Sequence, residues 1–237
     1  FALLRRHVSE AGIILEIDSP GGGVTACDEI HHALREFKAR DQGRVVIAIF
    51  YDMAASGGYY VACGADYIIA LPTTVTGSIG VLISAMNFRE LGQKIGVHDM
   101  TIKSGPNKDL LSPLGEMTPA QRALLQEIVE TLHNRFVGLV AEGRKLAIDQ
   151  VRGLSDGRIF TAPRALENRL IDAVGYWPDA VAKTRELLGQ EKIRVLRYEE
   201  TLSWRSIFSV LQRRPMIALP DMTSPSHTRI QYIWDPR

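Results

Sequence analysis

The chain has 237 residues, of which 46% are hydrophobic and 23% are charged, with 28 basic and 27 acidic side chains. These proportions are ordinary for a globular protein with a buried core, and a net charge of +1 gives no electrostatic basis for binding nucleic acid or an anionic membrane surface. No apolar run is long enough to span a bilayer. Because the sequence starts at Phe1, we expect a preceding segment, which could have carried a signal or a membrane anchor.

The first part of the chain is predicted to alternate between strands and helices. An apolar strand over residues 12–18 is followed by a helix with Ile30, Leu34 and Phe37 on one face, ending near Gly43, and by a strand over residues 45–50 that is buried on both sides. A short helix (59–65), a strand (67–70) and a turn with a further strand (77–83) come next. This alternation favours an α/β fold with a largely parallel sheet, in which sites lie beyond the carboxyl ends of the strands.

The second part is predicted to contain a long helix and then an irregular extension. Thr118, Pro119 and Gln121 form a typical helix start, and apolar residues recur at helical spacing as far as Val140. We expect this helix to pack on the sheet or on a partner subunit. From Glu191 to the end, prolines alternate with aromatic residues, which is typical either of an arm laid over another surface or of a poorly ordered tail.

Ser56 is the first candidate for chemistry. A lone serine among alanines is usually structural, but Ser56 follows an apolar strand and precedes Gly57 and Gly58, where the backbone can approach a substrate closely. A helix that starts just after Ser56 would direct N–H groups toward an oxyanion formed at its hydroxyl. From this context alone, a catalytic nucleophile and a structural serine are both open interpretations.

A glycine-rich turn, Ser19-Pro20-Gly21-Gly22-Gly23, follows the first strand. It either connects strand and helix tightly or contributes to a site, and it does not match the phosphate-binding glycine motifs. In a hydrolase, a backbone N–H of Gly21 or Gly22 could complete an oxyanion hole with Gly57, and residues 21–23 could pair with an extended substrate.

The base that would activate Ser56 is less clear from the residues alone. His98 lies in a turn near the other motifs and leaves a Ser–His–Asp arrangement open. Lys103 and Lys108 flank another turn, and a lysine can act as a base when burial lowers its pKa, although exposed lysines are the usual case. No metal-ligand spacing and no cofactor motif is present, and Cys27 and Cys63 are expected to be small buried side chains.

Four motifs in order resemble the signal peptide peptidase A family of serine peptidases. They are the segments DSPGGG (18–23), MAASGGYY (53–60), TGSIGV (76–81) and IKSGPNKD (102–109), and DGRIFT (156–161) resembles a later motif of that family. The resemblance covers residues 10–180 and implies a fold similar to the ClpP and crotonase group, with repeated ββα units. It makes residues 1–190 a Ser–Lys peptidase domain and residues 191–237 an extension that could contact other subunits.

By motif position, the resemblance implies Ser56 as nucleophile and Lys108 as general base, with Lys103 as a solvated neighbour. Ser78 would orient the lysine amine, and Gly22 and Gly57 would supply the oxyanion N–H groups. The family also implies a homo-oligomeric ring in which neighbouring subunits share each site. Its substrates are remnant signal peptides and other apolar unfolded segments. Members are commonly anchored in the bacterial or archaeal cell membrane by an N-terminal helix, with the protease domain outside the cytoplasm.

Two other interpretations stay open. One is a member of the same superfamily with a different role, either an inactive ClpP-like scaffold or an acyl-CoA enzyme of the crotonase kind. The other is a non-catalytic module that grips extended peptides through the glycine turn. The peptidase interpretation predicts an alkaline activity optimum, because the lysine must be neutral to accept a proton.

Overall fold

The computed structural model describes residues 11–197 and 231–233. The chain divides into two compact units, residues 1–191 with 228–237 and residues 192–227. In the second unit only residues 192–197 are described, and they form no helix or strand. The strands of the first unit are β1 (Gly12–Ser19), β2 (Gly21–Gly23), β3 (Val45–Ala55), β4 (Tyr67–Ala70), β5 (Val75–Gly77), β6 (Ile159–Thr161), β7 (Ala173–Val174) and β8 (Gln231–Ile233). Its helices are α1 (Val24–Ala39), α2 (Gly57–Ala62), α3 (Arg89–Lys94), α4 (Pro119–Arg144), α5 (Ile148–Arg152), α6 (Ala162–Glu167) and α7 (Trp177–Leu188).

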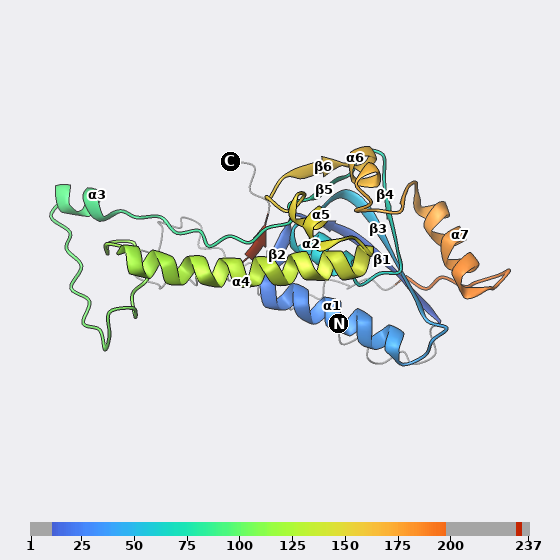
Figure 1. The fold of residues 1–237 in the computed structure, drawn as a ribbon, viewed down its shortest axis with the longest axis horizontal. Coiled ribbons are helices and arrows are strands. Elements are labelled where there is room, and N and C mark those ends of the chain that lie inside the picture. Colours follow the sequence, from blue (N-terminus) through green and yellow to red (C-terminus); the bar gives the residue numbers. More distant parts are fainter. Residues whose placement is uncertain (1–10, 198–230, 234–237) are drawn as a thin grey trace, which may run out of the picture. The chain divides into compact units, whose positions relative to one another are not determined.

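A largely parallel sheet is built around β3 (Figure 1). The first half of β3 pairs in parallel with β1 and with β4, and its last three residues pair in parallel with β5. β7 extends the sheet beside β4, and β6 closes the other edge as the single antiparallel neighbour among these six strands. The predicted α/β fold is confirmed, and the carboxyl ends of β3 and β5 come together.

Alternate residues of β3 face two different layers, as a strand with a two-residue period requires. Val46, Ala48 and Phe50 belong to the main core beneath α1, α2 and α4. Ile47 and Ile49 belong to a second apolar cluster that α7 covers. All five side chains have no exposed surface. The run over 45–50 is therefore buried on both faces, as predicted.

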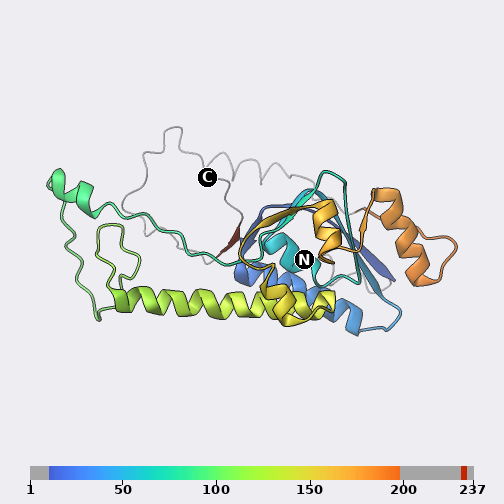
Figure 2. The same cartoon turned by 45° about the horizontal axis from the view of Figure 1, so that its top comes forward.

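α4 begins as predicted but packs only in part. The Thr118 side chain accepts from the Gln121 N–H (3.2 Å), and the Gln121 side chain accepts from the Thr118 N–H (3.0 Å), which makes a complete capping box. In the second half of the helix Phe136 and Val140 are fully buried. In the first half Leu124 and Ile128 are each 41% exposed. Figures 1 and 2 show this first half extending from the sheet toward α3.

The strand expected over residues 77–83 does not form. The sheet residues in this region are instead Val75–Gly77, followed only by an isolated bridge at Leu82. Gly77 has φ 91° and Ser78 has φ 51°, so two successive left-handed residues turn the chain out of the sheet. The apolar composition of residues 79–83 predicts a strand, but the preceding turn directs these residues away from the sheet, so they do not pair with it as a strand.

The helix ends and the two cysteines lie close to where the sequence predicts them. α1 ends at Ala39, before Gly43, and α2 begins two residues earlier than predicted. Cys27 and Cys63 are both buried and free, as expected. Most of the predicted irregular extension lies outside the described residues, although β8 within it is a regular strand. Among the described helices, none has both the length and the apolar character needed to cross a membrane.

Candidate functional site

Ser56 lies at the junction of β3 and α2, where the backbone turns sharply. Its φ of 52° and ψ of −113° fall in a region that glycine adopts freely and that costs other residues about 1–3 kcal/mol. Hydrogen bonds hold the junction, because the Ser56 N–H donates to Gly77 O (2.8 Å) and the Tyr60 N–H donates to Ser56 O (2.9 Å). Ser56 is fully buried, and its Oγ has no hydrogen-bond partner among the described residues. A strained serine with an unpaired hydroxyl has the features of a nucleophile that lacks its base.

Ser78 lies beside Ser56 at the end of the neighbouring strand. The register pairs Ala55 of β3 with Gly77 of β5, so each serine is the next residue after a paired strand end. Ser78 also has a left-handed φ, is 5% exposed, and donates its N–H to Arg158 O (2.8 Å). A side chain at Gly77 would collide with the Phe160 ring, since its Cβ would lie 2.6 Å from Cδ2. Glycine is thus required at the position that aligns the two serines.

The glycine turn forms a short strand next to α2. Gly58 packs so closely against the end of β1 that an added Cβ would lie 3.1 Å from Ser19 O. Gly57 is the first residue of α2, so its N–H has no acceptor within the helix. β2 contacts α2, which brings Gly22 and Gly57 to the same region. The structure therefore brings together Ser56, Ser78 and both glycine segments.

β2 has a strand partner from the end of the chain. β8 pairs with it antiparallel, with Gly21 opposite Ile233, Gly22 opposite Tyr232 and Gly23 opposite Gln231. β8 also contacts α2. One edge of the glycine strand, where an extended peptide was expected to pair, is thus occupied by the chain itself.

Lys108 is not brought to Ser56 within this chain. It is exposed, and no ion pair or side-chain hydrogen bond among residues 11–197 engages its amine, whereas Lys103 pairs with Asp109 at 2.8 Å. The Gln121 side chain donates to Pro106 O (2.7 Å), which ties the lysine turn to the first turn of α4.

α2, in contrast, packs on the far half of the same helix, where the Tyr60 and Phe136 ring centroids lie 5.0 Å apart. Gln121 and Phe136 are fifteen residues apart, or about 22 Å along the helix axis.

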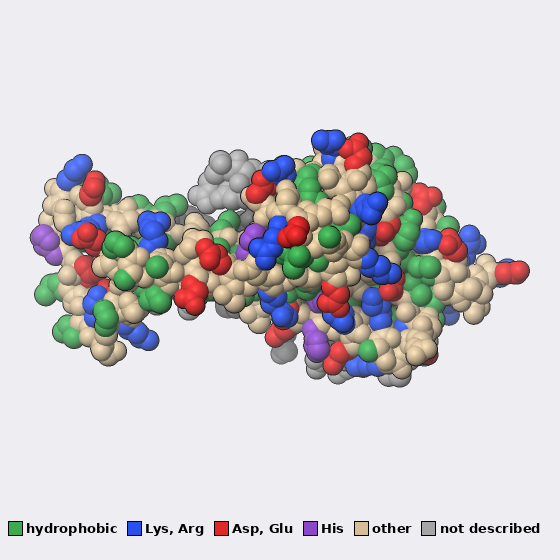
Figure 3. Space-filling view, in the orientation of Figure 1, with side chains coloured by type: hydrophobic (Ala, Val, Ile, Leu, Met, Phe, Trp, Pro, Cys, Tyr) green, Lys and Arg blue, Asp and Glu red, His purple; other side chains and the backbone are tan. Residues whose placement is uncertain are grey.

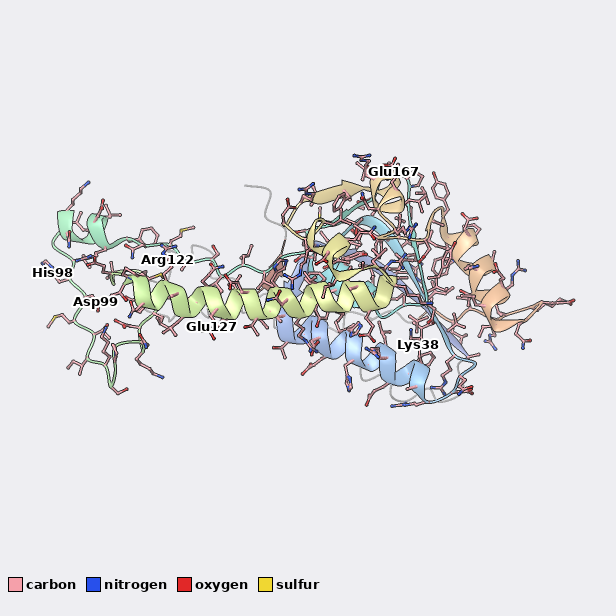
Figure 4. The ribbon with its side chains drawn as sticks, viewed as in Figure 1. Lys38, His98, Asp99, Arg122, Glu127 and Glu167 are labelled. Atoms are coloured by element: carbon pink, nitrogen blue, oxygen red, sulfur yellow. The ribbon has the colours of Figure 1, made fainter. Side chains whose placement is uncertain are left out.

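His98 is not near Ser56 either. It is exposed, and Figure 4 shows it with Asp99 beyond the N-terminal end of α4, on the side of α3. The Asp99 carboxylate accepts hydrogen bonds from Thr101 and Ser112, and none from His98. His98 and Asp99 therefore form no Ser–His–Asp arrangement with Ser56 in the described part of the chain.

A groove of about 420 Å³ opens beside Ser78. Val129 and His133 of α4 form one wall, and Leu82 and Asp156 contribute to the others. His133 Nε2 is buried without a hydrogen-bond partner in the described part of the chain. His133 could not be singled out from the sequence, because nothing in its local pattern indicates which face of the helix meets the groove. A second depression of about 470 Å³, at the end of α7, contains none of the predicted site residues.

No metal site accompanies these residues among the side chains that the structure describes. In the described part of the chain, no group of three or more His, Cys, Asp or Glu side chains is placed to hold a metal ion. The polar groups gathered at the ends of β3 and β5 are hydroxyls and backbone N–H groups, which suit acyl transfer to a serine.

The chain is similar in sequence to known proteins. The chain is 39% identical over 188 residues to an Enterococcus faecium protein named after signal peptide peptidase SppA, covering 79% of this chain and 54% of that protein. It is 34% identical over 213 residues to "Serine protease SPPA, chloroplastic" of Arabidopsis thaliana, covering 89% of this chain and 29% of that protein. The chain thus spans about half of the first relative and less than a third of the second.

The fold is similar to that of a ClpP1 point mutant from Listeria monocytogenes. The TM-score is 0.50 at 18% identity, covering 76% of this chain and 82% of the other. The profile of Peptidase family S49 matches residues 38–191, which is more than half of the chain. These residues include Ser56, Ser78 and Lys108, and the chain belongs to Peptidase family S49.

Proposed function

We propose that the chain is a serine endopeptidase with a Ser–Lys dyad, in which Ser56 is the nucleophile and Lys108 the general base. The observation that carries the proposal is the state of Ser56, whose left-handed backbone is strained and whose hydroxyl is buried without a partner among the described residues. Such a costly arrangement persists where the surrounding structure enforces it, and it occurs preferentially at active sites.

The two members of the dyad come from different subunits of a homo-oligomer. Lys108 is held near the first turn of α4, whereas Ser56 lies by its second half. The segment around Lys108 also exposes large apolar side chains, of which Ile95 is 67%, Met100 89% and Ile102 100% exposed. Figure 3 shows hydrophobic side chains at the surface on this side of the first unit. A neighbouring copy would cover such a surface and place its own lysine at the site.

In the proposed reaction, neutral Lys108 accepts the Ser56 proton as Oγ attacks the scissile carbonyl carbon. The N–H groups of Gly22 and Gly57 bind the oxyanion, and Ser78 orients the lysine amine. The lysine then protonates the leaving amine, and water, activated by the same lysine, hydrolyses the acyl-enzyme. Because the lysine acts in its neutral form, activity should be highest at alkaline pH.

The proposed substrates are extended, apolar peptides such as remnant signal peptides. β2 offers backbone groups for strand-to-strand pairing, and Val81, Leu82 and Val129 line the groove beside Ser78. Membrane contact, through a segment outside this sequence and with the protease domain outside the cytoplasm, is part of the same proposal.

A mixing experiment tests the dyad. Ser56→Ala and Lys108→Ala proteins, each expected to be inactive, are co-assembled and assayed on an apolar fluorogenic peptide at pH 8–9. Recovered activity supports a site shared between subunits. Lys103→Ala is the matched control, since it removes a lysine of the same turn that is paired with Asp109, and it should remain active.

Other outcomes select other interpretations. If Lys108→Ala retains full activity, the lysine base is wrong and His98→Ala becomes the variant to test. If the wild-type protein is neither active nor labelled by a fluorophosphonate, the peptide-binding module or the inactive scaffold replaces the enzyme.

A further inference from the structure

A hydrogen-bonded network joins three helices beside Ser56. One carboxylate oxygen of Asp28 on α1 accepts from the Tyr60 hydroxyl of α2 at 2.5 Å. The same oxygen accepts from Arg135 of α4, at 2.6 Å from Nη2 and 3.2 Å from Nε. These three residues are called the Asp28 network below. No sequence pattern predicts that they are in contact, because Asp28 and Arg135 are 107 positions apart.

The bonds of the network are charge-assisted at any pH where the enzyme would work. Burial and the Asp28 carboxylate both raise the pKa of Tyr60, so its hydroxyl remains a neutral donor. Burial alone would raise the pKa of Asp28, but the hydrogen bonds from Tyr60 and Arg135 lower it below its ordinary value. An ionised acceptor with two such donors makes shorter and stronger hydrogen bonds than neutral groups do.

The network acts on the turn that carries Ser56. The Tyr60 N–H donates to Ser56 O and so closes the first turn of α2. The Tyr60 side chain is fully buried, packs against Phe136 of α4 and makes a T-shaped contact with His31 of α1. α1 directly follows the glycine strand β2. A shift of the Tyr60 ring would therefore move α2 relative to both β2 and α4, which carry the other parts of the site.

We infer that Tyr60, Asp28 and Arg135 are positioning residues for the reaction. This inference rests on the proposed function, because it assigns to the Asp28 network the task of holding Ser56 Oγ and the Gly57 N–H in place. Ser56 has a strained backbone, so its conformation depends on the contacts around it. A small displacement of a nucleophile is costly, since misplacement by about 1 Å can reduce the rate about 100-fold.

The neighbouring tyrosine provides a matched control. Tyr59 is also fully buried, and its hydroxyl donates to Leu170 O at 2.8 Å. This bond joins α2 to the loop after α6 and does not involve α1 or α4. Tyr59→Phe and Tyr60→Phe each remove one hydroxyl, together with its hydrogen bonding, from a fully buried tyrosine of the same helix, so a purely structural role would give both variants the same behaviour.

The experiment compares these two variants in the full chain, with the peptide assay, thermal unfolding and the rate of Ser56 labelling by a fluorophosphonate. We expect both to unfold at somewhat lower temperature. Tyr60→Phe should lower kcat about 10-fold or more, slow labelling in parallel and leave KM within a factor of about two. Tyr59→Phe should keep kcat near the wild-type value.

Arg135→Lys is a second variant, because Arg135 is largely exposed and its replacement is compatible with folding. It loses the paired Nε and Nη2 contact and should reproduce the fall in kcat. Unchanged kcat in Tyr60→Phe and Arg135→Lys, or equal losses in Tyr59→Phe and Tyr60→Phe, would overturn the inference. Failure of the proposed function is distinguishable, because either the wild-type protein would then be inactive and unlabelled, or Ser56→Ala would retain activity.

Discussion

The strained backbone of Ser56 gives a prediction about stability that is independent of activity. Replacing Ser56 by glycine should stabilise the fold while abolishing catalysis. Two terms favour the variant: relief of about 1–3 kcal/mol of backbone strain, and removal of a buried, unpaired hydroxyl that costs about 1–3 kcal/mol. One term opposes it, since glycine loses about 0.5–1 kcal/mol more conformational entropy on folding.

Comparison with Ser56→Ala isolates the backbone term. Alanine removes the same hydroxyl but keeps the Cβ, so the left-handed strain remains. The glycine variant should therefore be more stable than the alanine variant by about 0.5–2 kcal/mol, which corresponds to about 1–8 °C in Tm for a domain of this size.

The assay is thermal and urea unfolding of the two variants under identical conditions. Ala55→Gly is the control, because Ala55 is fully buried one residue earlier and does not have a positive φ. Glycine should destabilise the protein there, opposite in sign to its effect at Ser56. A Ser56→Gly protein that is less stable than Ser56→Ala would refute the strain argument.

Two further predictions concern other parts of the same unit. Burial lowers the pKa of His31 to about 4, so between that pH and about 6.5 the unfolded state binds a proton that the folded state does not. The free energy of unfolding should therefore fall by up to about 2 kcal/mol from pH 7.5 to pH 5, and His31→Leu should lack this dependence in urea titrations. Equal slopes for both proteins would contradict the assignment. Gln121→Ala should cost about 1 kcal/mol of stability and reduce peptidase activity, because it breaks the capping box and releases the Lys108 turn. Gln150→Ala, at an exposed glutamine of α5, should do neither. Unchanged activity in Gln121→Ala would show that Lys108 needs no such anchor.

The parts of the fold that the sequence predicts are those determined by local pattern. The apolar run 45–50 has the length and β-branched composition typical of a strand buried on both faces, and the Thr118 and Gln121 spacing is typical of a helix start. The strand predicted over residues 77–83 does not form, and the cause is also local, because it lies in the backbone angles of the preceding turn. Ser78 adopts a left-handed conformation that its residue type does not indicate.

The sequence could predict which residues belong to the candidate site, but not how they are arranged in space. The strand ends place Ser56 beside Ser78, as expected for an α/β sheet, whereas the sequence cannot show that Lys108 is tied to the far end of a long helix. The Asp28 network was missed for the same reason. Its members come from three separate helices, and only tertiary packing brings them to one carboxylate oxygen.

The pairing of β8 with β2 sets a condition on every ligand of the glycine strand. A peptide that pairs with the edge that β8 occupies competes with a tethered segment whose effective concentration does not change when the protein is diluted. Its apparent affinity is the intrinsic affinity multiplied by the fraction of molecules in which that edge is vacant. Which peptides bind at this edge therefore depends on how much more favourably they pair with β2 than Gln231–Ile233 does.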